Sequence, residues 1–232
     1  MPLVFANLRS TYKFLALGEP HMAETIFIVR HGEAESNLGK YFGGQLDTPL
    51  TPLGRQQARV LQKRLSHEEI GKAFCSDLLR ARETLEGISL KCPAEYSKEL
   101  REKSYGELEG VRFDTETKYD KYHMDAYARA PGGENSVDVQ RRVAAYFKRK
   151  VFCAKEEKVL VVSHHGPIVL LVCDILGMPI KNWRRLRMGN CGLSILTRED
   201  NIWRLKLWNS LSHYGLLNFK PLLQRERKKS RQ

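Results

Sequence analysis

Residues 158–166 read K-V-L-V-V-S-H-H-G, and residues 25–32 read T-I-F-I-V-R-H-G. Both stretches begin with a short apolar run rich in β-branched residues, which is typical of a strand buried on both faces of a sheet. They predict strands over Lys158–Ser163, the clearer of the two, and over Thr25–Arg30. After the strand Thr25–Arg30, Gly32 would allow a sharp turn with unusual backbone angles.

Strands and helices alternate along the rest of the chain. A helix begins after Thr51, which can cap it, and Pro52 suits its first turn. Within residues 139–151 an apolar residue recurs every four positions, which predicts another helix. Further helices are predicted at residues 78–90 and 167–176, and further strands at residues 72–76, 194–196 and 203–208. This alternation predicts an α/β fold of three layers, with a mostly parallel central sheet and helices on both faces.

The chain is expected to form one domain with two short ends. The domain spans residues 22–220, and its more polar stretch 91–133 is interpreted as an inserted cap, an excursion from the main sheet that covers a site. Residues 1–21 are an N-terminal extension expected to be disordered. Their early basic residues resemble a transit peptide, but an extension of little structural consequence is the preferred interpretation. Residues 221–232 are a basic tail.

The composition is that of an ordinary globular protein, with 42% hydrophobic and 28% charged residues among 232. A formal net charge of +12 favours an anionic partner. Because part of this charge lies in the tail, binding to nucleic acid or to a membrane surface is a minor alternative and is not expected. No apolar run approaches the roughly 20 residues that span a bilayer. Five cysteines without the short spacing of a zinc or redox motif favour free thiols and a cytoplasmic location. The oligomeric state stays open, with a dimer as one alternative.

Two histidines and an arginine follow predicted strands near the points where those strands end. His31 and His164 come directly after the two buried strands, and Arg80 lies one turn into the helix after a strand ending at Ser76. In open α/β sheets, ligands bind beyond the carboxyl ends of the strands. A neutral imidazole is a competent nucleophile toward phosphorus, and guanidinium groups suit phosphate oxygens. The set therefore predicts phosphoryl transfer at this edge, with no metal ion or other cofactor required.

Six blocks of sequence stand in a characteristic order. They are V-R-H-G-E with Asn37 behind it, G-G-Q-L-D-T-P-L-T-P-L-G from Gly43, C-S-D-L-L-R-A-R-E-T from Cys75, L-R-E-K-S-Y-G-E-L-E-G from Leu100, P-G-G-E from Pro131 and V-V-S-H-H-G from Val161. Together they resemble the histidine phosphatase superfamily, also called the phosphoglycerate-mutase-like family, and in particular its small phosphatase branch. The resemblance covers about residues 25–213.

The resemblance implies a role for each matching residue. His31 would be the nucleophile that carries the phosphoryl group. Glu102 would be the acid that protonates the leaving oxygen and then the base that activates water. Arg30, Arg80 and His164 would clamp the phosphate during catalysis. The residues expected to contact phosphate or substrate are Arg30, Asn37, Gly43, Gly44, Arg80 and His164, and none is assigned to a metal ion.

The resemblance also implies an activity, a metal-independent phosphomonoesterase acting on a small phosphorylated metabolite. In a phosphatase, water attacks the phosphohistidine, whereas a mutase returns the phosphoryl group to the bound product. The stretch from Gly110 to Pro131 is short and leads to P-G-G-E, as in the smaller phosphatases, which favours hydrolysis over mutase-type transfer. A non-catalytic module that binds a phosphorylated ligand is a second alternative. The substrate stays open among α-ribazole phosphate, phosphoserine, phosphoglycerates, sugar phosphates and nucleotides.

Other notable residues are given structural or open interpretations. His165 stands where relatives often have glycine, and it either shapes the rim of the site or is a bystander. A solvated basic face is the preferred interpretation of four neighbouring residues, Trp183, Arg184, Arg185 and Arg187. Three tyrosines of the cap are expected to pack within it: Tyr119, Tyr122 and Tyr127.

Overall fold

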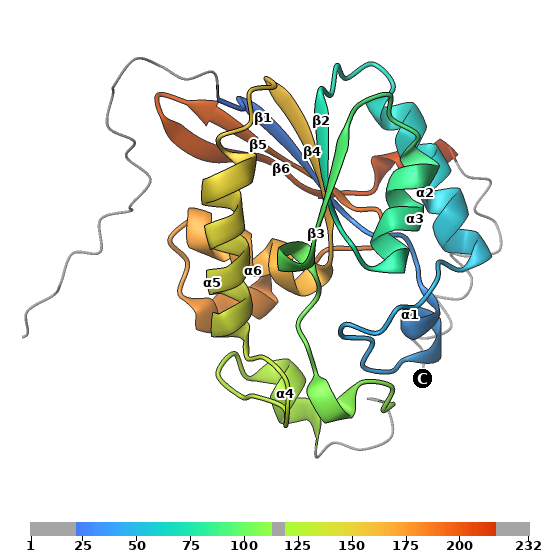
Figure 1. Cartoon of the computed structure of the whole chain (residues 1–232), viewed down its shortest axis with the longest axis vertical. Coiled ribbons are helices and arrows are strands. Elements are labelled where there is room, and N and C mark those ends of the chain that lie inside the picture. The colour runs from blue at the N-terminus through green and yellow to red at the C-terminus, as the bar shows by residue number, and fades with distance from the viewer. Residues whose placement is uncertain (1–21, 113–118, 217–232) are drawn as a thin grey trace, which may run out of the picture.

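The structure, a computed structural model, describes residues 22–112 and 119–216. The predicted extension of residues 1–21 and the tail of residues 221–232 therefore lie outside the described residues. Within them the predicted α/β fold is confirmed, with one six-stranded sheet between helices on both faces (Figure 1). The strands, in their order across the sheet, are β3 (Ala94–Ser97), β2 (Lys72–Ser76), β4 (Lys158–Ser163), β1 (Thr25–Arg30), β5 (Leu193–Glu199) and β6 (Ile202–Ser210).

The sheet is mixed, although most of its strands are parallel. β3, β2, β4 and β1 run parallel to one another, and β5 and β6 are antiparallel to their neighbours. β1, β2 and β4 have the predicted bounds, because each is a short buried run, whereas β5 and β6 are longer than predicted. The sequence pattern does not predict β3, which pairs with β2 at the start of the stretch 91–133. The interpretation of that stretch as an excursion from the sheet is therefore wrong for β3. The pattern missed this strand because its side chains are exposed or half-buried and give no apolar run.

Helices cover both faces of the sheet. α2 (Pro52–Leu65) and α3 (Leu79–Ile88) lie on one face, and α5 (Ser136–Tyr146) and α6 (His165–Ile175) lie on the other (Figure 1). The predicted helix of residues 139–151 comprises α5 and a π-helical segment that continues it. The shorter segments are α1 (Glu35–Gly39), α4 (Asp120–Met124), the π-helical Phe147–Val151, and 3-10 helices at Lys98–Leu100, Gly106–Leu108, Ile180–Arg185 and Ser212–Leu216.

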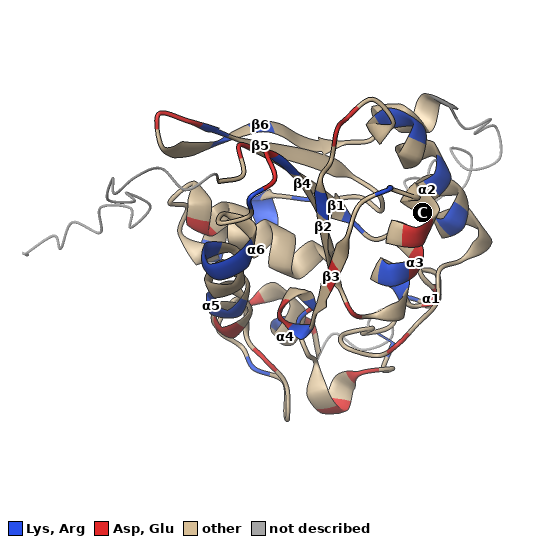
Figure 2. Ribbon diagram, turned by 45° about the horizontal axis from the view of Figure 1, so that its top comes forward, with Lys and Arg blue, Asp and Glu red and all other residues tan. Residues whose placement is uncertain are grey.

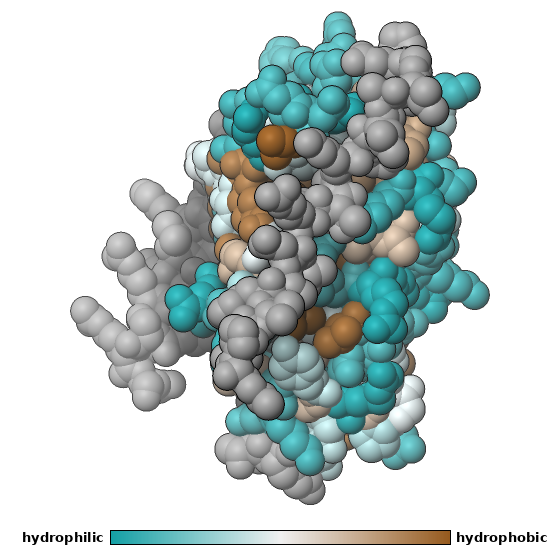
Figure 3. All heavy atoms as spheres, turned by 90° about the vertical axis from the view of Figure 1, so that its left-hand side faces the viewer, coloured by the Kyte–Doolittle hydropathy of each residue, from teal (hydrophilic) through white to brown (hydrophobic). Residues whose placement is uncertain are grey.

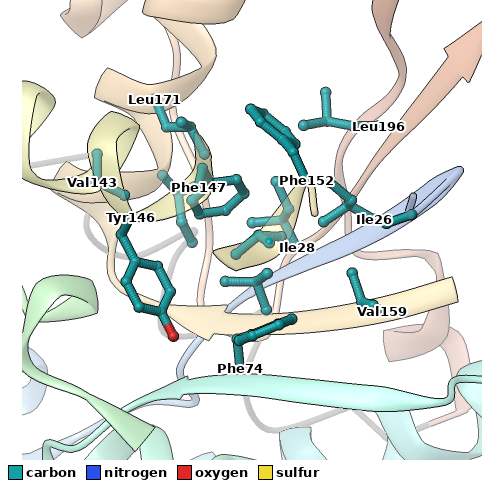
Figure 4. Close-up of a cluster of buried hydrophobic side chains, with 14 of the residues drawn as sticks. Ile26, Ile28, Phe74, Val143, Tyr146, Phe147, Phe152, Val159, Leu171 and Leu196 are labelled. Atoms are coloured by element: carbon teal, nitrogen blue, oxygen red, sulfur yellow. The ribbon is translucent and has the colours of Figure 1, made fainter. Parts of the chain in front are cut away.

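Alternating residues of the buried strands supply two separate cores. In β1, Ile26 and Ile28 pack with α5 and α6, whereas Phe27 and Val29 pack with α2 and α3. Figure 4 shows the first of these cores, in which Ile26 and Ile28 lie among aromatic rings from α5 and the segment after it. A strand that is buried in this way must be apolar on both sides, which is why its sequence pattern identifies it.

The pairing of β1 with β4 brings the two strand-end histidines to one edge of the sheet. Arg30 is level with Ser163 in the parallel register, so His31 and His164 follow at the same height. The backbone N–H of His31 donates to the carbonyl oxygen of Ser163 over 3.0 Å. β2 lies on the other side of β4, and the hydroxyl of Ser76 at its end is 2.8 Å from Nε2 of His164. The prediction that these strand ends converge is confirmed.

Gly32 is required by close packing rather than by an unusual backbone angle. Its φ lies outside the left-handed region, so the reason expected from the sequence is wrong. A Cβ at Gly32 would lie 2.6 Å from the carbonyl oxygen of Gly54 in α2, and a Cβ at Gly54 would overlap the carbonyl oxygen of Glu33. The N–H of Gly54 donates to the Thr51 hydroxyl over 3.0 Å, which confirms the predicted helix cap. The turn after β1 therefore rests directly on the first turn of α2.

We expect Gly54→Ala to lower the free energy of unfolding by about 1–3 kcal/mol, the usual cost of overpacking. The added methyl group would overlap a backbone carbonyl, which cannot move away as a flexible side chain would. Urea denaturation followed by circular dichroism measures the loss. Gln56→Ala, at an exposed position of the same helix, is the control and should change the free energy by less than about 0.5 kcal/mol. Equal stability of the two variants would contradict the close contact.

The part of the 91–133 stretch that follows β3 forms a small cap with its own apolar cluster. Phe42 and Leu108 are buried in this cluster, and Tyr119 and Tyr122 pack against it as expected. Tyr127 is 59% exposed, so its predicted packing is wrong. Of these three tyrosines, two therefore pack in the cap and one faces solvent.

The described surface is largely polar. Lys and Arg lie along α2 and α5 (Figure 2), and the face seen in Figure 3 is mostly hydrophilic with small, separate apolar patches. Among the described helices, none has both the length and the apolar character required of a membrane span. All five cysteines are free thiols, and three of them are buried.

Candidate active site

A cavity opens at the edge of the sheet where β1 and β4 end. Its volume is about 600 Å³, which is within the range of small-molecule sites in proteins. His164 is fully buried and does not line it, but its ring centroid lies 5.0 Å from that of His31. The other seven residues predicted for the site all line the cavity: Arg30, His31, Asn37, Gly43, Gly44, Arg80 and Glu102.

The imidazole of His31 is held in one tautomer and is neutral. Its Nδ1 lies 2.7 Å from the carbonyl oxygen of Gly32. Because a carbonyl only accepts hydrogen bonds, Nδ1 carries the ring proton and Nε2 carries the lone pair. Burial and the guanidinium groups of Arg80 and Arg30 hold the pKa of His31 well below its usual value of 6.5. The ring is therefore uncharged at pH 7, as a nucleophile must be.

The buried side chain of Arg80 and the half-buried side chain of Arg30 line the same cavity. Arg80 is 2% exposed, and its two terminal nitrogens donate to the carbonyl oxygens of Leu46 and Gly44, each over 2.7 Å. Burial lowers the pKa of Arg80 to about 10, which leaves the side chain charged at pH 7. Arg30 donates from Nη1 to the carbonyl oxygen of Met188 over 2.7 Å, and its buried Nε has no partner among the described residues. Two fixed positive charges with an unused donor suit an anion.

His164 has one paired nitrogen and one unpaired nitrogen. Its Nε2 lies 2.8 Å from the Ser76 hydroxyl, and its buried Nδ1 has no partner within the described part of the chain. The Ser76 oxygen accepts from the N–H of Leu78 over 3.4 Å, so its own proton can be donated to Nε2. Burial and Arg80 hold the pKa of His164 well below 6.5, so the ring is neutral. In this arrangement Nδ1 is an unused N–H donor near His31, which fits the predicted clamp.

Two backbone N–H groups position the carboxylate of Glu102. The N–H of Lys103 donates to Oε1 over 2.8 Å, and the N–H of Gly166 donates to Oε2 over 3.2 Å. Gly166 lies in the first turn of α6, where the helix dipole also favours a negative charge. A Cβ at Gly166 would overlap Oε1, so the glycine of the H-H-G block leaves room for the carboxylate.

The P-G-G-E block supports the Glu102 segment from outside the cavity. Its Glu134 accepts from the N–H of Ser104 over 3.0 Å and forms an ion pair of 2.8 Å with Arg142 of α5. Arg142 also donates to the carbonyl oxygens of Arg101, over 3.0 Å, and of Glu102, over 3.4 Å. Glu134 and Arg142 therefore position the loop that carries the predicted acid, although neither lines the cavity.

Asn37 and the Gly43–Gly44 loop form another wall of the cavity. The amide oxygen of Asn37 accepts from the N–H of Ala34 over 3.0 Å and from the side chain of Asn190 over 3.2 Å. The amide Nδ2 group of Asn37 is then the donor available for a ligand. Gly44 has a φ of 45°, which favours glycine, and its carbonyl oxygen holds Arg80.

The structure adds to the cavity residues that sequence reasoning assigned elsewhere. Trp183 is 7% exposed, so its interpretation as part of a solvated face is wrong, whereas Arg184, Arg185 and Arg187 are exposed. The H-H doublet was a local signal for His165, and Lys103 and Tyr105 lie in the block that carries Glu102, but no pattern marked His123. The added lining residues include Lys103, Tyr105, His123, His165, Trp183, Arg184 and Arg187.

The arrangement combines a nucleophile, anion-binding groups and an acid–base group in one place. A neutral imidazole with a free lone pair lies with two guanidinium groups and a carboxylate that backbone N–H groups position. Residues 22–112 and 119–216 contain no cluster of three or more His, Cys, Asp or Glu side chains that could hold a metal ion. Chemically, such a set can transfer a phosphoryl group by nucleophilic attack with proton transfer.

Comparisons with known proteins give matches over most of the chain. A family model described as the histidine phosphatase superfamily (branch 1) matches residues 26–211. The probable phosphoglycerate mutase GpmB of Serratia proteamaculans (strain 568) is 34% identical over 191 residues, which are 79% of this chain and 89% of that protein.

Two solved structures of phosphatases also match most of this chain. The putative α-ribazole-5′-P phosphatase from Escherichia coli str. K-12 substr. MG1655 is 27% identical with a TM-score of 0.73, over 81% of this chain and 97% of that chain. A mycobacterial glucosyl-3-phosphoglycerate phosphatase is 29% identical with a TM-score of 0.69, over 81% of this chain and 99% of that chain.

Proposed function

Because this chain belongs to the histidine phosphatase superfamily (branch 1), we propose that it hydrolyses a small phosphorylated metabolite without a metal ion, through a phosphohistidine intermediate on His31. One observation carries the proposal. The imidazole of His31 is neutral, is oriented by Gly32 through Nδ1, and shares one cavity with the guanidinium groups of Arg30 and Arg80.

In the first step, Nε2 of His31 attacks the phosphorus atom. A nitrogen–phosphorus bond forms while the bond from phosphorus to the leaving oxygen breaks, and that oxygen takes the proton of Glu102, which enters this step as the neutral carboxylic acid. Negative charge spreads over the three equatorial oxygens of the phosphoryl group. Arg30 and Arg80 stabilise this charge, together with the Nδ1 donor of His164, because all three are already in place before the reaction.

In the second step, water attacks the phosphohistidine. Glu102, now ionised, takes a proton from the water as its oxygen bonds to phosphorus. The nitrogen–phosphorus bond breaks, inorganic phosphate leaves, and His31 returns to its neutral form. The two N–H donors from Lys103 and Gly166 keep the carboxylate in the same position for both steps.

We expect the acid limb of the kcat/KM profile to lie well below pH 6.5. Protonation of His31 would remove its lone pair, but burial and the nearby arginines depress its pKa in the folded protein. The nucleophile therefore stays neutral and competent as the pH falls through 6.5, and activity is lost only closer to its lowered pKa. The measurement is the pH profile with p-nitrophenyl phosphate, corrected for ionisation of the substrate near pH 6. Loss of half the corrected activity at pH 6.5 would contradict a depressed pKa.

A phosphoglycerate mutase is the second candidate, and the similarity to a probable phosphoglycerate mutase supports it. The same His31, Arg80 and Glu102 would serve it, with the phosphoryl group returned to the bound product. The short stretch between Gly110 and Pro131 favours hydrolysis, as do the names of the two structural relatives, which are both phosphatases.

The first experiment is a phosphate-release assay on a panel of phosphomonoesters, with a metal chelator present throughout. Release of phosphate from at least one metabolite under these conditions is the expected result. Conversion of 3-phosphoglycerate to 2-phosphoglycerate without net phosphate release would support the mutase instead. Binding of phosphorylated ligands without any turnover would support a non-catalytic binding module and would refute the enzyme proposal.

We also propose a cytoplasmic location and a small phosphorylated molecule as the main partner, with no nucleic acid or membrane surface as a ligand. The five free thiols are consistent with a reducing compartment. Fractionation of cells that express the tagged full chain tests the location. Recovery of most of the protein from an organelle would refute it.

A further inference from the structure

Beyond the phosphate-binding end, the cavity is lined by a continuous series of side-chain rings. Phe42, Tyr105, His123, Trp183 and His165 all line it, and we call them the ring-lined subsite. Adjacent members are close together, with centroid distances of 4.6 Å for Phe42–Tyr105, 6.5 Å for Tyr105–His123, 6.3 Å for His123–Trp183 and 6.2 Å for Trp183–His165. These distances are in the range of favourable ring contacts.

Core packing holds two of these rings in place. Phe42 is 3% exposed and is part of the apolar cluster of the cap. Trp183 is 7% exposed and packs with Val169 and Leu170 of α6. The hydroxyl of Tyr105 lies 3.0 Å from Nδ1 of His123, which connects two further rings to each other. A ligand would meet surfaces that are already positioned and would not have to order them.

The two imidazoles of the subsite act as neutral rings. Burial lowers the pKa of His165 to about 4. His123 is exposed as a whole, but desolvation where its ring meets Tyr105 and Trp183 lowers its pKa as well. Nδ1 of His165 lies 3.4 Å from the Met188 carbonyl oxygen, the same oxygen that accepts from Arg30. His165 therefore connects the phosphate-binding end of the cavity to Trp183.

A second set of side chains at the same cavity suggests a different ligand. Arg184 and Arg187 line it, are exposed, and form no ion pair with any described acidic residue. They could meet a second anionic group on a substrate. Exposed arginines are mobile and are often simply solvated. Of the five rings only His123 is exposed, and the other four are buried or half-buried and lie at the distances given above. The rings are therefore the stronger observation.

We infer that the ring-lined subsite binds the leaving group of the substrate, and that this leaving group carries a planar unsaturated ring. The inference rests on the proposed function, because it identifies the class of phosphomonoester that the site prefers. A flat ring can stack on or meet edge-on the aromatic surfaces, and a cavity of about 600 Å³ has room for it beside the phosphate.

The test compares four phosphate esters of alkyl alcohols, so that each needs similar protonation of its leaving oxygen. They are 2-phenylethyl, 2-cyclohexylethyl and n-propyl phosphate, with 3-phosphoglycerate as the doubly acidic substrate. We expect kcat/KM for the phenylethyl ester to be about tenfold higher than kcat/KM for the propyl ester. We expect it to be about threefold higher than kcat/KM for the cyclohexylethyl ester. Equal values for the phenylethyl and propyl esters would overturn the inference while leaving the phosphatase proposal intact. A higher value for 3-phosphoglycerate than for the phenylethyl ester would assign this end of the cavity to a second anion and would also overturn it.

Two variants connect the preference to the rings. His165→Gly and His123→Ala should each reduce the phenylethyl-to-propyl ratio to about threefold or less, because each removes one ring contact. Trp183 is left unchanged because it packs in the core. Tyr127→Ala, which removes an exposed ring of the cap outside the cavity, is the matched control and should keep the ratio. An unchanged ratio in both histidine variants would overturn the inference.

A binding measurement separates failure of the subsite from failure of catalysis. Calorimetric titration with 2-phenylethylphosphonate and n-propylphosphonate, which cannot be hydrolysed, should show about tenfold tighter binding of the first. If no ester releases phosphate but this preference holds, the proposed function is refuted and the ring-binding subsite stands. If the preference is absent, the inference is overturned whatever the turnover.

Discussion

Replacing His31 with alanine is expected to lower kcat for phosphomonoester hydrolysis by at least about 10⁴-fold, because it removes the imidazole proposed to form the covalent intermediate. The variant should still fold. The imidazole is buried and neutral, its loss removes a single hydrogen bond to Gly32, and the contacts of Arg80 do not involve it. Phosphate release measures kcat, and circular dichroism with thermal denaturation checks the fold.

The control for this variant is His67→Ala. It makes the same side-chain change at an exposed position, so kcat should stay within about twofold of the parent. Rapid mixing of the parent enzyme with substrate, followed by denaturation, should recover a phosphoryl group on the protein that His31→Ala lacks. Residual activity above about 1% in a folded His31→Ala protein would refute the nucleophile assignment.

Replacing Glu102 with glutamine is expected to slow alkyl phosphates far more than aryl phosphates. An alkyl alcohol is a poor leaving group and needs a proton as its bond to phosphorus breaks, so loss of the acid should cost about 10²–10⁴-fold for n-propyl phosphate. p-Nitrophenolate leaves without protonation, so that substrate should slow by less than about tenfold when formation of the intermediate limits the rate. Pre-steady-state measurement of the first step with both substrates isolates the effect of the acid.

Glutamine is chosen because it keeps the size of the side chain and one acceptor oxygen for the N–H of Lys103 or Gly166. Glu107→Gln, the same change at an exposed position of the same segment, is the matched control and should slow neither substrate. Equal slowing of the two substrates by Glu102→Gln would indicate a positioning role and would count against Glu102 as the acid.

Much of the candidate site could be predicted because its strands are buried on both faces. Such strands must be apolar throughout, so the sequence pattern predicted β1 and β4 correctly. The positions of His31 and His164 at the ends of these strands could then be predicted as well. The helix cap at Thr51 could also be predicted, because a cap depends on a few neighbouring residues. The role of Glu102 came from a family motif and not from any pattern of burial, and it remains a prediction.

Other features could not be predicted because their cause is not local. β3 has no apolar run, and its pairing with β2 becomes visible only in the assembled sheet. The need for glycine at position 32 was predicted for the wrong reason, since the constraint is the backbone of Gly54 in another element. The buried position of Trp183 in a basic segment depends on its packing against α6.

The sequence alone therefore determined which residues form the central strands, where His31 and His164 follow them, and to which family the blocks belong. These features depend on burial and motif patterns that repeat over a few neighbouring residues. The tertiary structure alone decided the tautomer of His31, the unused donors on Arg30 and His164, and the rings that surround the rest of the cavity. The tautomer depends on where the turn after β1 directs the Gly32 carbonyl, and that turn rests on Gly54 of α2. The other features depend on contacts between segments far apart in the chain, and such contacts exist only after the chain has folded.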